Sequence, residues 1–247
     1  MKVLATYSIK GGVGKTTSAV NLAREAAIAG SRVLVWDLDP QGAATFFFRI
    51  EAKVKGGTER LVSSKGDLVG HVRASDILGV HVVPADFSLR HLDLHLDGGK
   101  RPTERLALLL AGVGARYDVA VLDCPPSISL ASESVFGAAD ALLVPVIPTT
   151  LSSRTLHQLS DFLGSQDSPP ALLPYFSMVD IRKRLHREVM ASLRDEWPNL
   201  LATPIPNAST IERMGPERAP VGSYAPSSLA AQSFASLWAE VAARLWS

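Results

Sequence analysis

The residues from Lys10 to Thr17 have the types and the spacing of a loop that holds phosphate groups. They read Lys-Gly-Gly-Val-Gly-Lys-Thr-Thr, directly after a short apolar run and directly before a segment of helical periodicity. Glycines let backbone N–H groups approach phosphate oxygens with no Cβ in the way, and the start of a helix adds partial positive charge. We therefore expect a nucleotide to be bound by Gly11, Gly12, Val13, Gly14, Lys15, Thr16 and Thr17.

Three side chains of this loop have separate expected roles. Lys15 is expected to reach the β- and γ-phosphates, the Thr16 hydroxyl to ligate Mg²⁺, and Thr17 to contact the α-phosphate. The spacing departs from the ordinary Walker A pattern, because Ile9 stands where the first glycine belongs and an extra lysine, Lys10, lies near the start of the loop. A lysine beside a transferring phosphoryl group neutralises developing charge. The alternative for Lys10 is a solvated loop lysine.

Carboxylates follow two further apolar runs. Asp37 and Asp39 end one of them, and two carboxylates at this spacing can address the water shell of a metal ion and a nucleophilic water. The continuous apolar run from Val119 ends in Asp123, which has the form of a Walker B strand whose carboxylate holds a magnesium-bound water. The alternative for each aspartate is structural; Asp39, for example, could do no more than cap the next helix.

Short apolar runs alternate with segments of helical periodicity along the whole chain. Expected strands cover 3–8, 32–36, 80–84, 119–122, 141–147, 172–178 and a short last run at 201–205. Expected helices cover 16–29, 88–96, 102–112, 156–162, 185–197 and 229–245. This alternation indicates a single α/β domain over 1–247, with a doubly wound, mostly parallel sheet flanked by helices. Right-handed crossovers then bring the βα loops to one ligand-binding edge, and we read 53–70 as a surface loop.

The composition excludes several classes of protein. The chain has 247 residues, is 47% hydrophobic and carries a formal net charge of +1, so any affinity for DNA has to come from a local patch. Its one cysteine, Cys124, excludes a disulfide framework and a four-cysteine zinc site. Since no base is indicated near Cys124, we read it as a small buried thiol and not as a nucleophile. The sequence shows neither a signal peptide nor a membrane span, and we expect a cytoplasmic protein.

Three segments resemble motifs of one family. The loop Lys10–Thr17 looks like the deviant Walker A motif of the ParA/MinD group of P-loop ATPases. The segment Asp37–Gly42 is similar to the Asp-x-Asp-Pro-Gln-Gly switch segment of that group, and Asp123–Pro126 is similar to its Asp-Cys-Pro-Pro segment. The overall likeness covers most of the chain and is specific in these three places.

The resemblance implies a mechanism. ATP and Mg²⁺ are the implied cofactors, and ATP joins two chains into a homodimer in which Lys10 contacts the nucleotide of the partner subunit. Asp39 is tied to hydrolysis, so Lys10, Lys15 and Asp39 are the implied catalytic residues. The metal ion is expected near Thr16, Asp37 and Asp123.

The segment Thr203–Asn207 resembles the part of the family that lines the adenine. Pro206 and Asn207 are therefore expected near the base. The family usually has Arg-Asn after Ile-Pro, whereas this chain has Asn207 followed by Ala208. A plain loop is the alternative interpretation.

The densest basic segment lies further along the chain and contains Arg182, Lys183, Arg184 and Arg187. In the resembling proteins this region helps to form the DNA-binding face of the ATP dimer. Lysine and arginine here would contact phosphates and carry no sequence code. The alternative is a solvated amphipathic helix.

These expectations combine into a ParA-like ATPase that binds DNA non-specifically in its ATP-dimer form. Weak hydrolysis, stimulated by a partner protein at the cargo, would segregate or position a chromosome, a plasmid or a protein assembly on the nucleoid. One alternative is a membrane-cycling, MinD-like division-site ATPase. We expect no membrane binding, because residues 229–247 contain Arg244 as their one basic residue, unlike a lipid-binding helix. The other alternative is a nucleotide-gated scaffold with negligible turnover.

Overall fold

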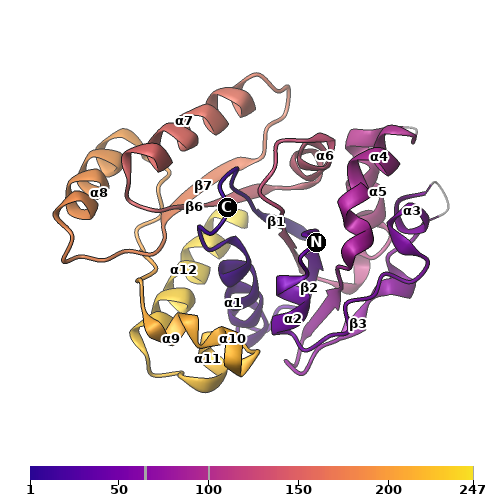
Figure 1. Cartoon of the computed structure of the whole chain (residues 1–247), viewed down its shortest axis with the longest axis horizontal. Helices are drawn as coiled ribbons and strands as arrows, with labels where there is room; N and C mark the ends of the chain where they lie inside the picture. The colour runs from indigo at the N-terminus through magenta and orange to yellow at the C-terminus, as the bar shows by residue number, and fades with distance from the viewer. Residues whose placement is uncertain (64–65, 100, 247) are drawn as a thin grey trace.

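A seven-stranded sheet forms the centre of the computed structural model, which describes residues 1–63, 66–99 and 101–246 (Figure 1). In sheet order the strands are β3 (Arg73–Ala74), β4 (Val80–Val83), β2 (Val33–Asp37), β5 (Val119–Asp123), β1 (Lys2–Thr6), β6 (Ala141–Val146) and β7 (Ala171–Phe176). Neighbouring strands pair in parallel, except that β3 is antiparallel to β4. The predicted doubly wound, mostly parallel α/β sheet is confirmed.

Helices cover both faces of this sheet. They are α1 (Lys15–Ile28), α2 (Ala43–Phe47), α3 (Gly57–Val62), α4 (Leu92–Asp97), α5 (Arg105–Ala111), α6 (Leu130–Ala138), α7 (Thr150–Gly164), α8 (Arg184–Glu196), α9 (Ser209–Glu212), α10 (Met214–Glu217), α11 (Val221–Tyr224) and α12 (Leu229–Leu245). Short 3₁₀ turns lie at Val69–His71, Phe87–His91, Pro102–Glu104 and Gly114–Arg116.

The central strand β5 shows how the sequence produces two cores. Its residues alternate between the faces of the sheet: Val119 and Val121 join the core under α1 and α12, whereas Ala120 and Leu122 join the core under α4 to α7. Every residue of β5 is buried, because helices lie on both sides. The continuous apolar run therefore identifies β5, whose carboxyl end places Asp123 at the predicted nucleotide site.

Two sequence interpretations are wrong. The expected strand 201–205 is no strand: Leu201 and Ile205 each donate one backbone hydrogen bond to β7, but Pro204 has no N–H to extend a ladder. Within the described part of 53–70, the expected loop contains α3 and a 3₁₀ turn, since Leu61 and Val62 bury their side chains in the core. Residues 64 and 65 of that segment lie outside the described residues.

The C-terminal helix α12 packs on the sheet, as predicted. Its apolar stripe is buried and consists of Phe234, Leu237, Trp238, Val241 and Leu245. The helix runs beside α1 (Figure 1), and both belong to one hydrophobic core. This face of α12 is therefore occupied by protein. Within the described residues no helix has both the length and the apolar character that a membrane crossing requires.

Phe234→Ala tests whether α12 is part of the folding core. The ring is fully buried, so its loss should lower the free energy of unfolding by about 3–5 kcal/mol. The measurement is urea unfolding followed by circular dichroism. Leu229→Ala is the control on the same helix, because Leu229 is 70% exposed and its loss should change stability by less than about 0.5 kcal/mol. Equal effects of the two substitutions would contradict the packing.

Candidate nucleotide and magnesium site

The glycine-rich loop joins the end of β1 at Thr6 to the start of α1 at Lys15. Gly12 (φ 70°) and Gly14 (φ 99°) adopt left-handed conformations that other residues rarely take, which explains why glycine occupies both positions. The Lys15 ammonium donates to the carbonyl oxygen of Lys10 at 3.1 Å. The loop thus curls around the lysine at the N-terminus of α1, as phosphate binding requires.

Two carboxylates on neighbouring strands end beside this loop. Asp123 of β5 pairs in register with Thr6 of β1 on one side and with Asp37 of β2 on the other. Thr6 Oγ1 donates to Asp123 Oδ1 at 3.3 Å, and no described residue donates a hydrogen bond to the buried Oδ2. Burial and the charge of Asp37 raise the pKa of Asp123, while the Thr16 hydroxyl and the Lys15 ammonium oppose that rise.

An orphaned carboxylate oxygen next to a threonine hydroxyl fits a magnesium ion with its waters. Mg²⁺ keeps several waters and uses few protein ligands when substrate phosphates complete its shell. The Oδ2 of Asp123 and the hydroxyl of Thr16 would supply that environment. The residues present are therefore consistent with the predicted metal site.

Lys15 lies deeper in the site than a surface lysine. Its side chain is buried, and burial lowers its pKa while the charges of Asp123 and Asp39 act in the opposite direction. A buried ammonium is costly unless it is paired with opposite charge. Lys15 is thus placed to meet a strongly anionic ligand.

Asp37 has a structural role in this structure. Its Oδ1 accepts the N–H of Asp39 at 3.2 Å, and its Oδ2 accepts the N–H and the hydroxyl of Thr45 at 2.8 and 2.7 Å. Burial raises the pKa of Asp37 to about 6. Asp39 is half-buried, and its Oδ1 accepts the N–H of Gln41 at 2.9 Å. The metal role of Asp37 stays a prediction, whereas its hydrogen bonds fix the start of α2.

The far end of α2 is fastened as well. Arg49 donates to the carbonyl oxygens of Glu217 and Arg218, and it forms an ion pair with Asp76 at 3.3 Å. The Arg218 guanidinium donates to the carbonyl oxygen of Phe46 and lies over its ring at 4.4 Å. The short helix after Asp39 is therefore held at both of its ends.

A pocket beside the phosphate loop fits the predicted base site. It is lined by Gly14 and Thr17 on one side and by Pro206 and Asn207 on the other. The N–H of Asn207 donates to the carbonyl oxygen of Val179, which anchors this loop to the segment after β7. The structure thus brings Pro206 and Asn207 next to the phosphate loop, although they are about 190 positions further along the chain.

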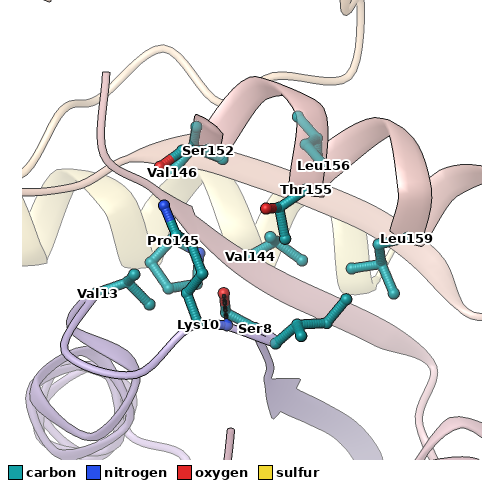
Figure 2. A pocket seen from close by; sticks show the side chains of 11 residues that line it. Ser8, Lys10, Val13, Val144, Pro145, Val146, Ser152, Thr155, Leu156 and Leu159 are labelled. Carbon is teal, nitrogen blue, oxygen red and sulfur yellow. Dashed lines mark hydrogen bonds between the residues drawn. The ribbon is translucent and has the colours of Figure 1, made fainter. Parts of the chain in front are cut away.

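Lys10 lies in a hollow between the phosphate loop and α7. Figure 2 shows its side chain extending along Pro145 toward Ser152 at the start of α7. Leu156 and Leu159 of α7 line the other end of the hollow. Lys10 therefore rests against its own chain here, and its action across a dimer stays a prediction.

The predicted basic segment surrounds the start of α8 and is solvent-exposed; it comprises Arg182, Lys183, Arg184 and Arg187. Two of these cations have acidic partners. Asp180 accepts from Arg182 through both oxygens, which lowers its pKa to about 2, and Glu188 pairs with Arg184 at 2.6 Å. Arg187 instead donates to the carbonyl oxygens of residues 181 and 182. The local positive charge is smaller than the count of basic residues indicates.

Cys124 is 2% exposed, and burial raises the pKa of its thiol well above the usual value. A thiol of this kind is a poor nucleophile, because the thiolate is the reactive form. The structure supports the interpretation of Cys124 as a small buried residue.

Comparison with known proteins assigns the chain to a family. A family model described as an AAA domain matches residues 1–168. The Bacillus subtilis sporulation initiation inhibitor protein Soj is 30% identical over 98% of both chains. The Caulobacter vibrioides chromosome partitioning protein ParA is 35% identical over 64% of this chain and 61% of its own length. The chain belongs to the ParA/MinD-type P-loop ATPases.

A solved structure supports the same fold. The cobyrinic acid a,c-diamide synthase of Mycobacterium smegmatis, with bound ADP and magnesium, superposes with a TM-score of 0.81 at 26% identity. The match covers 100% of this chain and 95% of that one. This ParA/MinD-type ATPase therefore shares its complete fold with a nucleotide-binding protein.

Sequence patterns missed two residues that shape the site of this ParA/MinD-type ATPase, Thr45 and Ser177. Thr45 holds Asp37 from α2, which has five residues and is too short to show helical periodicity. Ser177 donates to Val13 in the phosphate loop and lies after β7, where the sequence has no motif of its own. The contact of Ser177 with the phosphate loop joins residues 164 positions apart, so no local sequence pattern indicates it.

Lys15→Ala and Lys10→Ala form a matched pair in one loop. The Lys15 ammonium is buried at the predicted phosphate position, so its loss should weaken ATP binding by about 100-fold or more. Lys10 is expected to act on a partner's nucleotide, so Lys10→Ala should retain ATP affinity within about fivefold. The measurement is equilibrium binding of a fluorescent ATP analogue to dilute protein. Retained affinity in Lys15→Ala would contradict the phosphate role.

Proposed function

We propose that this chain binds MgATP, dimerises around it, and hydrolyses it slowly to segregate or position a cargo on DNA. The observation that carries the proposal is the convergence of Lys15, Thr16 and Asp123 at one end of the sheet. A buried cation, a hydroxyl and an orphaned carboxylate oxygen are the groups that a magnesium–phosphate ligand requires.

In this proposal the chain contributes position and charge. Mg²⁺ neutralises charge that develops on the phosphate oxygens, with Thr16 and Asp123 holding it or its waters. Lys15 balances the remaining phosphate charge. Asp39 lies on the half-buried loop between β2 and α2, from which its carboxylate can orient the attacking water. Lys10 would reach the nucleotide of the second subunit once two chains meet.

The proposed partners follow from the relatives and from the surface. Proteins named for chromosome partitioning and sporulation control favour DNA as the track over a lipid surface. The exposed basic segment at α8 offers phosphate contacts that need no base sequence. The apolar face of α12 is occupied by α1 and the sheet, which weighs against the membrane-cycling alternative.

The fold alone does not select the reaction, since one solved neighbour is named as a cobyrinic acid a,c-diamide synthase. We favour cargo positioning because the Soj relative matches 98% of both chains at 30% identity. The cytoplasm and the nucleoid are the proposed location, and a protein at the cargo is the proposed stimulator of a weak basal ATPase. A scaffold with negligible turnover is distinguished by its failure to respond to such a partner.

Asp39→Ala tests hydrolysis and DNA binding together. The variant should bind ATP, lose about 100-fold or more of its turnover, and accumulate as a dimer. Binding to a random-sequence DNA duplex should appear with ATP, be absent with ADP, be strongest in the variant, and fall steeply with salt. The measurements are phosphate release, light scattering after size exclusion, and fluorescence anisotropy of labelled DNA.

Asp118→Ala is the matched carboxylate control. Asp118 pairs with Arg32 just before β5, at the end of the strands opposite the predicted nucleotide site. It should leave turnover and DNA binding unchanged. Normal turnover in Asp39→Ala would remove Asp39 from hydrolysis. ATP-dependent dimers that bind no DNA would point to a membrane or protein surface as the track.

The basic segment is tested by replacing Lys183 and Arg187 together with alanine. DNA affinity should fall, and the slope of log affinity against log salt should decrease by about 2, while ATP-dependent dimerisation is unchanged. The control replaces the exposed ion pair of Arg101 and Glu104, which lies outside the basic segment, with two alanines; the net charge stays constant and DNA affinity should not change. Unchanged DNA affinity in the first double variant would exclude this segment from the interface.

A further inference from the structure

A buried serine after β7 fastens the phosphate loop from outside the loop. Ser177 is 3% exposed, and its Oγ donates a hydrogen bond of 2.8 Å to the carbonyl oxygen of Val13. In the sheet, β6 separates β7 from β1, whose end leads into the loop. The phosphate loop is one short stretch of sequence, yet its conformation depends on a residue 164 positions away that follows a strand.

This hydrogen bond fixes the peptide unit between Val13 and Gly14. None of the described peptide bonds is cis, so the C=O and the N–H of this unit point in opposite directions. With the Val13 carbonyl turned toward Ser177, the Gly14 N–H points away from it. A half-turn of the peptide would exchange the two groups and would present a carbonyl oxygen where a donor had been. Phosphate oxygens accept hydrogen bonds from N–H groups and are repelled by carbonyl oxygens.

The loop has particular need of such a tether. Gly12 and Gly14 have φ values of 70° and 99°, and glycine loses more conformational freedom on ordering than any other residue. The contact also explains the choice of residue at position 14, because a Cβ there would lie 2.9 Å from Ser177 Oγ. Ser177 and Gly14 are thus fitted to each other.

The same segment also holds the pocket assigned to the base. Ser177 lines that pocket together with Pro206 and Asn207. The N–H of Val179 donates to the carbonyl oxygen of Ile205, and the carbonyl oxygen of Val179 accepts from Asn207. The chain after β7 therefore links the base side of the site to the phosphate side through one hydroxyl.

We propose that Ser177 is a positioning residue for the triphosphate, which keeps the Val13–Gly14 peptide in the orientation that presents the Gly14 N–H to phosphate. The inference rests on the proposed function, because it takes ATP as the ligand. It adds a residue outside the known motifs to the groups on which phosphate affinity depends. Ser177 touches the loop and not the reacting atoms, so its effect should appear in binding.

The test measures the affinity of the full chain for MgATP and for magnesium tripolyphosphate by competition with a fluorescent ATP analogue. Ser177→Ala should weaken the binding of both ligands by about tenfold, the loss expected for a buried hydrogen bond that orients the site. The affinity of Ser177→Thr for both ligands should stay within about twofold of the wild type. Valine has the shape of threonine without the hydroxyl, so Ser177→Val should lose as much affinity as the alanine variant. This Thr and Val pair keeps the test decisive if the alanine variant fails to fold.

Ser134→Ala is the control for a general loss of stability. Ser134 is fully buried, and its Oγ accepts from the N–H of Leu106, in the core under α5 and α6. It should lower the melting temperature without changing either affinity. Unchanged affinity in Ser177→Val, or a loss confined to ATP and absent for tripolyphosphate, would overturn the assignment. A wild-type chain that binds neither ligand would instead defeat the proposed function, and this inference with it.

Discussion

The parallel register of β1, β5 and β2 is the constraint on which the site depends. It sets Thr6, Asp123 and Asp37 side by side at the carboxyl ends of three neighbouring strands. Because side chains alternate along a strand, a slip of one residue would turn Asp123 to the other face of the sheet. The buried valines and leucines of these strands hold the register, so the hydrophobic core decides where the carboxylates lie.

The same constraint gathers costly groups in one place. Asp37, Asp123 and Lys15 are all buried, and isolated burial of any of these charges would destabilise the fold. Thr45 compensates Asp37 by two hydrogen bonds of 2.8 and 2.7 Å. Asp123 is stabilised by a longer hydrogen bond from Thr6, by the Thr16 hydroxyl and by the Lys15 ammonium, and its Oδ2 has no hydrogen-bond partner among the described residues. The compensation is least complete at Asp123, where the resemblance places the metal ion. The most costly burial thus coincides with the predicted metal site.

The sequence was informative where a residue's role depends on its neighbours in the chain. Glycines at positions of positive φ, apolar runs covered on both faces, and aspartates at strand ends were all recognisable, because each follows from local geometry. The short helices and the β7 contacts were not, because they depend on which segments meet in space. The run at 201–205 looks like a strand by composition, yet Pro204 prevents a continuous ladder.

The attachments at both ends of α2 have a consequence for the entropy of the site. Asp37 accepts two hydrogen bonds from Thr45, so residues 38–44 form a loop that contacts within the fold hold closed. Arg49, just after α2, donates hydrogen bonds to the segment before α11 and holds that end of the helix in place. These bonds restrict movement of α2 together with the loop that precedes it. Most of the conformational freedom of Asp39 is therefore lost on folding and not on binding. The fold thus largely meets the entropic cost of ordering the segment that carries Asp39, the predicted hydrolytic residue.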